Sequence, residues 1–403
     1  MKLLRHDQPD FAEAIARAMA TSSLFDPQIE ERVRVIIADV QTRGDAALIE
    51  LTERFDKVRL GQLAVTGPTP NVPTDLKKAI AVAQTNIAGF AKKSLRKNWA
   101  MRNAQGAAVG EKFECFDRVG IYVPGGTAPL VSTVLMTVTL AKVAGCKEIV
   151  VCTPPPVNPN LLYTCRKAGA TEIYQVGGAQ AIAAMALGTG TIKRVQKIFG
   201  PGNAYVVAAK RLLFGHVAID LLPGPSEVLI IADDSANPAF VAADLLAQAE
   251  HGSGHERVWL VTTSSRVLEE TEAATRRSPV EPVGVLAKDL SQAVAITNQF
   301  APEHCQLMTK KSLANRIQTA GAIFVGPWSP TVAGDYVAGP SHTLPTGGSG
   351  RSFAGLTVDQ FQRRTSVVEL SKKALKKSLP AIEKFAEVEG LDAHAASARK
   401  RFE

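Results

Sequence analysis

The stretch Val119-Gly-Ile-Tyr-Val-Pro-Gly-Gly126 is a short apolar run that ends in a proline and two glycines. A segment with helical character follows it to about Ala144, and a second predicted strand covers residues 148–152. The order of strand, turn and helical segment recurs from residues 172–176 and 195–199. Short apolar strands that alternate with helices are typical of a parallel, doubly wound sheet. The sequence therefore predicts an α/β fold around this stretch.

A second series of strands and helices follows towards the C-terminus. Residues 228–232 and 258–262 are apolar runs of strand length, and residues 238–250 between them show helical spacing. The alternation continues to residues 323–325. Two such series predict two α/β lobes with a cleft between them.

Both terminal parts of the chain show apolar residues every three or four positions, which predicts helices. In the first hundred residues the predicted helices cover 11–19, 29–40, 46–55 and 75–97, with a loop at 68–73. The last forty residues also read as helix but contain few bulky apolar groups. We expect such a tail to pack on the body of the protein or on a second subunit.

The composition is that of a globular protein long enough for two or three hydrophobic cores. Of the 403 residues, 46% are hydrophobic and 21% are charged. No apolar run approaches the roughly 20 residues of a membrane span, and the first residues lack the apolar stretch of a secretory signal. We therefore expect a cytoplasmic protein without a membrane partner.

The net charge of +8 lies partly in lysines and arginines of the tail. These residues recur at helical spacing with few aromatic residues between them, which favours a solvated helix face over a nucleic-acid surface. A mildly positive surface also suits an anionic dinucleotide. The five cysteines show no CxxC spacing, so we expect reduced, mostly buried thiols and no cysteine-ligated metal.

Three of the predicted strands are followed by glycine-containing turns, at residues 125–126, 177–178 and 200–202. Glycine lets a phosphate approach the main chain, and the helix behind each turn offers free N–H groups. Neither GxGxxG nor GxxxxGK[ST] is present, and ordinary turn chemistry explains any single turn. Three such turns on successive strands leave a nucleotide site and ordinary turn chemistry as equal alternatives. Residues suited to contact it are Tyr122, Gln180 and Asn203.

A set of imidazole, amide and carboxylate side chains is suited to one divalent cation. Gln248 and His251 are three residues apart at the end of a predicted helix, so they share a face. Asp335 lies in a glycine-rich stretch, and His394 lies on the tail without a packing reason. These donors fit zinc best. The chain contains seven histidines, so other sets remain open on spacing alone.

The tetrapeptide Ala301-Pro-Glu-His304 places a carboxylate directly beside an imidazole. Adjacent side chains on an extended strand point to opposite sides, so Glu303 and His304 reach one reaction centre only if the chain turns there. The pair then reads as two proton-transfer groups of one pocket. An exposed acid and a surface histidine are the alternative for the isolated pair.

Together these segments resemble the histidinol dehydrogenase family. The matching stretches occur in the family's order and cover nearly the whole chain. They are Val119-Gly-Ile-Tyr-Val-Pro-Gly-Gly126, Val176-Gly-Gly-Ala-Gln-Ala181, Ile198-Phe-Gly-Pro-Gly-Asn-Ala204, Gly224-Pro-Ser-Glu-Val-Leu-Ile230, Asp244-Leu-Leu-Ala-Gln-Ala-Glu-His251, Ala301-Pro-Glu-His304, Ala333-Gly-Asp-Tyr336, His342-Thr-Leu-Pro-Thr346 and Glu389-Gly-Leu-Asp-Ala-His394.

The resemblance implies a zinc-dependent, four-electron oxidation of L-histidinol to L-histidine through the aldehyde, with two NAD, as the last step of histidine biosynthesis. It implies a homodimer in which helical tails are exchanged and complete the neighbour's site. It also implies two incomplete Rossmann-like, doubly wound lobes. We expect one lobe from residues 1–118 and 225–357 with the N-terminal helices, the other from 119–224, and a helical dimerisation tail from 358–403.

The resemblance also implies roles for individual residues. Glu303 and His304 match the proton-transfer pair, and Tyr122, Gln180 and Asn203 match NAD contacts. The residues that match zinc ligands are Gln248, His251, Asp335 and His394. The residues that match substrate contacts are these four together with Ser226, His304, His342 and Glu389.

The chain departs from the family pattern at a few points. The stretch 268–286 is short by a turn or two of helix, and Cys305-Gln306 replaces a more apolar, acidic continuation. Ser341 replaces an asparagine before His342, which bears on substrate specificity. A related zinc and NAD dehydrogenase of another amino or sulfonated alcohol therefore stays open. A zinc hydrolase is a further alternative, although it has no use for the glycine turns.

Overall fold

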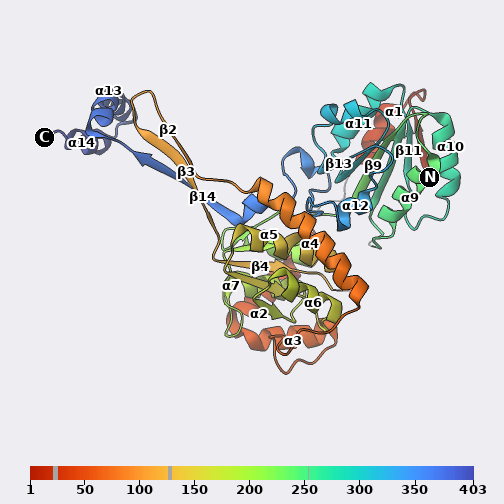
Figure 1. The fold of residues 1–403 in the computed structure, drawn as a ribbon, viewed down its shortest axis with the longest axis horizontal. Helices are drawn as coiled ribbons and strands as arrows, with labels where there is room; N and C mark the ends of the chain where they lie inside the picture. The colour runs from red at the N-terminus through yellow and green to blue at the C-terminus, as the bar shows by residue number, and fades with distance from the viewer. Residues whose placement is uncertain (21–25, 126–128, 253) are drawn as a thin grey trace.

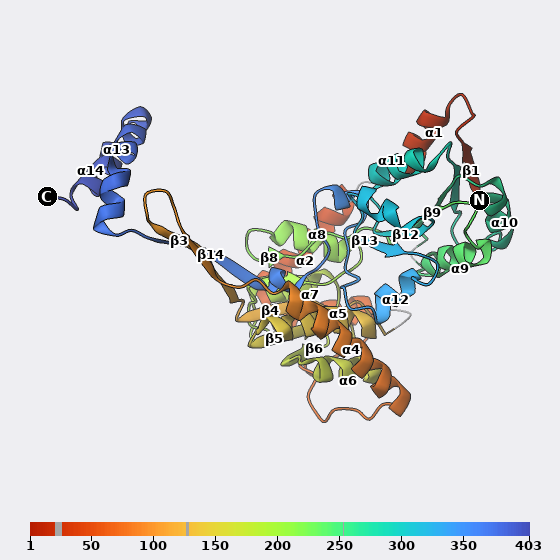
Figure 2. The same ribbon diagram turned by 45° about the horizontal axis from the view of Figure 1, so that its top comes forward.

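The computed structural model describes residues 1–20, 26–125, 129–252 and 254–403. Figures 1 and 2 show two α/β lobes and a long arm that carries the C-terminal helices away from both of them. The predicted α/β class is confirmed, because each lobe has a parallel sheet with helices on its faces. Within the described ranges, no helix is long and apolar enough to cross a membrane.

The main lobe is built on a parallel sheet with the order β1-β11-β10-β9-β12-β13. The strands are β1 (Lys2–Arg5), β9 (Glu227–Ala232), β10 (Arg257–Thr262), β11 (Val283–Leu286), β12 (His304–Met308) and β13 (Ala322–Val325). Its helices are α1 (Phe11–Met19), α9 (Pro238–Ala249), α10 (Ser265–Ala274), α11 (Leu290–Phe300) and α12 (Thr331–Tyr336). Alternate residues of β9 enter the cores on the two faces, so the central strands are buried on both sides.

The second lobe is built on a parallel sheet with the order β6-β5-β4-β7-β8. Its strands are β4 (Arg118–Tyr122), β5 (Glu148–Cys152), β6 (Glu172–Tyr174), β7 (Lys197–Phe199) and β8 (Ala218–Ile219). Its helices are α2 (Pro27–Arg43), α3 (Asp45–Asp56), α4 (Thr74–Ser94), α5 (Val131–Ala144), α6 (Pro159–Ala168), α7 (Gly178–Leu187) and α8 (Ala204–Leu213). The strand order places the carboxyl ends of β4, β5 and β7 side by side.

Helices α2, α3 and α4 pack on the second lobe, which differs from the expected grouping of residues 1–118 with the main lobe. Val33, Val40 and Leu48 share a hydrophobic core with α7 and α8, and Ile80 and Ile87 share one with α5. From residues 1–118, β1 joins the sheet of the main lobe and α1 packs in its core, while Asn86 of α4 donates to Val337 O after α12 at 2.8 Å. An amphipathic pattern identifies the buried face of a helix but not the partner that covers it.

The arm is an antiparallel sheet that the sequence did not predict. It has the order β14-β3-β2, with β2 (Trp99–Arg102), β3 (Ala108–Cys115) and β14 (Gln362–Glu369). Helices α13 (Lys372–Glu389) and α14 (Asp392–Arg399) lie at its far end (Figures 1 and 2). The expectation of pure helix over the last forty residues is therefore wrong for β14. Strand β14 pairs with β3 along its whole length, and it contains the β-branched residues Thr365, Val367 and Val368, which favour strands.

Candidate active site at the junction of the two lobes

Glu303 and His304 lie where α11 turns into β12. Ala301 closes α11 in the left-handed conformation with φ 54°, and Pro302 follows it. Both catalytic candidates are buried and are held by the backbone of Glu227 in β9. The N–H of Glu227 donates to Glu303 Oε2 at 2.8 Å, and His304 Nδ1 lies 3.0 Å from Glu227 O. Because a carbonyl only accepts, Nδ1 carries the proton and Nε2 faces the site.

Asp335 on α12 faces His304 from the opposite side, with its Oδ1 3.4 Å from His304 Nε2. Burial by itself lowers the pKa of His304, but attraction to Glu303 and the interaction with Asp335 raise it to about 10. Burial raises the pKa of Asp335, whereas His304 and, more weakly, His342 and His251 lower it overall. The carboxylates and imidazoles of this site therefore lie close enough to influence one another.

Two of the expected metal ligands, Gln248 and His251, lie at the C-terminal end of α9, which contacts α12. Gln248 is buried, and its Nε2 has no hydrogen-bond partner among the described residues. A buried amide without a partner calls for a ligand. His251 Nδ1 lies 3.0 Å from Gln248 O, which leaves Nε2 available. With Asp335, these side chains form a nitrogen and oxygen donor set that fits zinc.

The fourth expected ligand, His394, does not join the other three in a single copy of the chain. It is exposed on α14 at the end of the arm, and the expected substrate residue Glu389 is exposed at the end of α13 (Figure 1). In the part of the chain that the structure describes, no three His, Cys, Asp or Glu side chains form a group suited to a metal ion. One copy of the chain therefore does not bring the four expected ligands together.

The remaining substrate candidates are Ser226 in the main lobe and His342 on a segment that contacts the second lobe. Ser226 directly precedes β9. His342 Nδ1 lies 3.0 Å from Asp335 O, and its Nε2 lies 3.4 Å from Thr133 Oγ1 in α5. Ser341, where the chain departs from the family pattern, is buried and donates to a main-chain carbonyl of α5 at 3.4 Å. This segment joins the two lobes, and no sequence motif pointed to Thr133.

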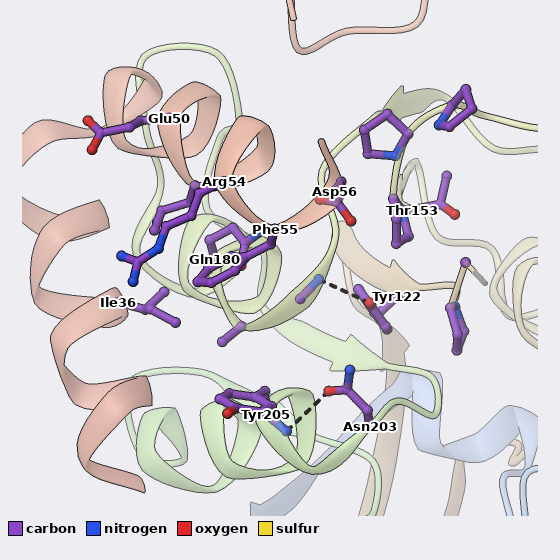
Figure 3. A pocket seen from close by; sticks show the side chains of 18 of the residues that line it. Ile36, Glu50, Arg54, Phe55, Asp56, Tyr122, Thr153, Gln180, Asn203 and Tyr205 are labelled. Atoms are coloured by element: carbon purple, nitrogen blue, oxygen red, sulfur yellow. Dashed lines mark hydrogen bonds between the residues drawn. The ribbon is translucent and has the colours of Figure 1, made fainter. Parts of the chain in front are cut away.

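A cleft of about 1110 Å³ lies at the carboxyl ends of β4 and β5 in the second lobe. Tyr122, Gln180 and Asn203 all line it (Figure 3). Gly125 of the first glycine pair lines it too, whereas Gly126 lies outside the described residues. The residues predicted from the glycine turns thus converge on one cavity, whose volume is sufficient for a large ligand such as a dinucleotide.

The turn between β7 and α8 requires a glycine at position 200. Gly200 has φ 112°, and a Cβ there would lie 2.1 Å from Tyr122 O, so no larger residue fits. Asn203 caps α8, with its Oδ1 accepting from two backbone N–H groups of the first turn. The fully buried Lys210 donates to Gly200 O at 3.0 Å and pairs with Asp220. No motif had indicated this buried ion pair, which braces the turn.

Helices α2 and α3 form a further wall of the cleft that the sequence did not reveal (Figure 3). In an amphipathic helix the polar residues that face a ligand look the same as those that face water, so periodicity carries no signal for them. The polar and aromatic residues on this wall are Arg32, Asp39, Glu50, Arg54, Phe55 and Asp56.

The substitution Arg257→Met is expected to lower the free energy of unfolding by about 3 kcal/mol, because it leaves a buried carboxyl group without its cation. Arg257 Nη1 donates to Oε1 of the fully buried Glu227 at 3.0 Å. Burial raises the pKa of Glu227 to about 7, against the opposing attraction of Arg257. Urea denaturation followed by circular dichroism measures the change.

Lys384→Met is the control for this prediction, because it removes a cation from a pair with Glu387 whose side chains are 67% and 68% exposed. An exposed pair of this kind contributes less than about 1 kcal/mol. Equal losses of stability in the two variants would contradict a special role of the buried pair.

Comparison with known proteins gives one consistent result. A sequence model of the histidinol dehydrogenase family matches residues 19–402. The histidinol dehydrogenase of Geobacillus kaustophilus is 45% identical, over 97% of this chain and 99% of its own length. That of Bacteroides fragilis is 44% identical, over 100% of this chain and 99% of its own.

Solved structures agree. The crystal structure of histidinol dehydrogenase from Elizabethkingia anophelis has a TM-score of 0.94 and 36% identity, covering 100% of this chain and 98% of its own. An acetylating aldehyde dehydrogenase from Geobacillus thermoglucosidasius, with a TM-score of 0.51 and 13% identity over 90% of this chain and 95% of its own, shares the fold alone.

Proposed function

This chain belongs to the histidinol dehydrogenase family, and we propose that it oxidises L-histidinol to L-histidine through the aldehyde with two NAD and one zinc ion. The family match makes it a dehydrogenase of histidine biosynthesis. The observation that most supports the full reaction is the meeting of Glu303, His304 and Asp335 in one buried site, beside a lobe with a separate cleft.

Zinc would be held by Gln248, His251 and Asp335 with His394 of a second copy, and would supply a fixed anchor for the imidazole and amino groups of histidinol. The donor types fit this ion, and the unpartnered amide of Gln248 supports it. If Asp335 also bound the zinc ion, it would stabilise the imidazolium of His304 less, and the pKa of His304 would be lower. The neutral imidazole of His304 would then be able to accept a proton.

Proton transfers divide between the two neighbouring side chains. His304 Nε2 accepts the hydroxyl proton of histidinol while the carbinol carbon loses a hydride to the nicotinamide of NAD. The carboxylate of Glu303 then accepts a proton from the water that adds to the aldehyde, while the imidazolium of His304 returns its proton to the carbonyl oxygen and becomes neutral again. The hydrate loses its second hydride to a fresh NAD, and its hydroxyl proton again goes to His304. Each group is already oriented by the backbone of Glu227.

The tail supports a homodimer with exchanged arms. Phe385 and Val388 on α13 are 68% and 73% exposed and lie three residues apart, so they share one face of the helix, which is suited to contact with another protein surface. Trp328 in the main lobe, in contact with Phe240 of α9, is 85% exposed. A second copy whose tail covers this face would bring His394 and Glu389 to the incomplete site.

The test is turnover with purified protein. We expect L-histidinol to yield two NADH for each L-histidine, with loss of activity after metal chelation and recovery with zinc. NADH formation from a sulfonated diol, with none from histidinol, would overturn the substrate assignment. Zinc-dependent hydrolysis without NADH would favour the hydrolase alternative, which the match to a dehydrogenase family already disfavours.

A further inference from the structure

We propose that Asp56 selects NAD over its 2′-phosphorylated form by accepting hydrogen bonds from the adenosine ribose. The inference rests on the proposed function, because it takes the cleft in Figure 3 as the dinucleotide site. Asp56 is the last residue of α3 and lines the cleft near Tyr122 (Figure 3).

Asp56 has no structural partner that explains its position. Its Oδ2 is buried and accepts no hydrogen bond from the described residues. An acidic residue at the C-terminal end of a helix also meets the negative end of the helix dipole, which is unfavourable. The other carboxylates on this wall differ, because Asp39 and Glu50 each bind Arg43 at 2.6 Å. A group that costs stability and lacks a partner indicates a ligand that provides one.

The position of Asp56 relative to the phosphate subsite fits a ribose. The N-terminus of α7 has no side-chain cap, and Gly178 N donates to Tyr122 OH at 3.1 Å. Free N–H groups at such a helix start bind a pyrophosphate. Burial raises the pKa of Tyr122 to about 12, and the nearby charge of Asp56 adds to the shift, so the two side chains are neighbours. A ribose is attached directly to each phosphate of a dinucleotide.

The direction of the ligand identifies which ribose this is. The nicotinamide must approach Glu303 and His304, and the second lobe meets that site through Thr133 of α5. Helix α3 lies on the side of the second lobe that faces away from the main lobe (Figure 1). The end of the dinucleotide beside Asp56 is therefore the adenosine end, where NADP carries its additional phosphate.

The chemistry at Asp56 discriminates between the two cofactors. A carboxylate only accepts hydrogen bonds, and the ribose hydroxyls of NAD donate them. A 2′-phosphate has acceptors only and repels the carboxylate. Two arginines on the same wall would attract that phosphate once Asp56 is neutral. Arg54 lies over the ring of Phe55, and Arg32 donates to Tyr205 OH at 3.0 Å.

The experiment measures NADH and NADPH binding to the full-length protein by fluorescence titration, which does not depend on turnover. We expect Asp56→Asn to weaken NADH binding about 10-fold or more and to shift the NADPH to NADH affinity ratio about 100-fold towards NADPH. Asp56→Ser should act in the same direction and replaces the asparagine variant if that one does not fold. The corresponding ratios of kcat/KM should follow.

Glu50→Gln is the matched control. It removes one negative charge from the same wall, but this carboxylate is bound by Arg43, so the affinity ratio should change less than about 3-fold. An unchanged ratio in both Asp56 variants, or an equal shift in the control, would overturn the proposal while leaving the proposed function intact. If the unaltered protein bound neither cofactor, the proposed function itself would fail.

Discussion

Glu303→Gln is expected to lower the rate of aldehyde oxidation by about 100- to 10,000-fold while lowering alcohol oxidation by about 10-fold or less. The glutamine keeps the size of the side chain and an oxygen that accepts the N–H of Glu227, which donates to Glu303 at 2.8 Å. It cannot accept a proton from water. The step that adds water to the aldehyde therefore loses its base, whereas removal of the alcohol proton still has His304.

The two half-reactions are measured separately, by supplying histidinol or the aldehyde and following NADH in a single turnover. Glu13→Gln serves as the control, because it makes the same substitution at an exposed position of the main lobe. The rates of both half-reactions should remain unchanged in this control variant. Equal losses in the two half-reactions of Glu303→Gln would contradict the division of labour between Glu303 and His304.

Co-assembly of two inactive variants, Asp335→Asn and His394→Asn, is expected to restore about a quarter of the normal number of active sites. Each variant alone should lose bound zinc and nearly all activity, because every site lacks one ligand. With exchanged tails, a mixed dimer has one site with both defects and one site with none. Random mixing places about half of the dimers in this mixed form.

The measurement combines activity with zinc content, determined by elemental analysis after mixing under mild denaturation and refolding. A mixture of unaltered protein with itself, taken through the same procedure, corrects for losses on refolding. If His394 completed the site of its own chain, the mixture would show no recovery. Unchanged zinc in His394→Asn alone would exclude it as a ligand.

The parallel sheets could be predicted from the sequence because their strands are buried on both faces. Residues 149–152 form one continuous apolar run, and they lie in β5 as expected. Strand β14 could not be found in this way, because its residues are exposed along most of its length and its polar and apolar side chains share the surface. This segment forms a strand because it pairs with β3, which is distant in the sequence. The local pattern of apolar residues holds no information about that pairing.

The candidate site could also be predicted only in part from the sequence. Tyr122, Gln180 and Asn203 follow strand ends, and the strand order of a parallel sheet brings such positions together. Asp56 lies on a helix from a different part of the chain, and the residues next to it in the sequence form no motif that indicates a ligand site. His394 could be chosen from the sequence as one of several possible donors, but only the resemblance matched it to a zinc ligand, and one copy of the chain leaves it exposed on α14, away from the expected partners.

The arm is completed late in protein synthesis. Strand β14 pairs with β3 from Ala108↔Glu369 to Cys115↔Gln362, and β14 leaves the ribosome only after both lobes have been made. Contacts between such distant residues form slowly and late. A nascent chain thus completes its lobes before its own arm exists, so the arm exchange that we propose would be confined to released, full-length polypeptides. A product terminated before residue 362 would keep both lobes and lack the strand and helices through which we propose that two copies associate.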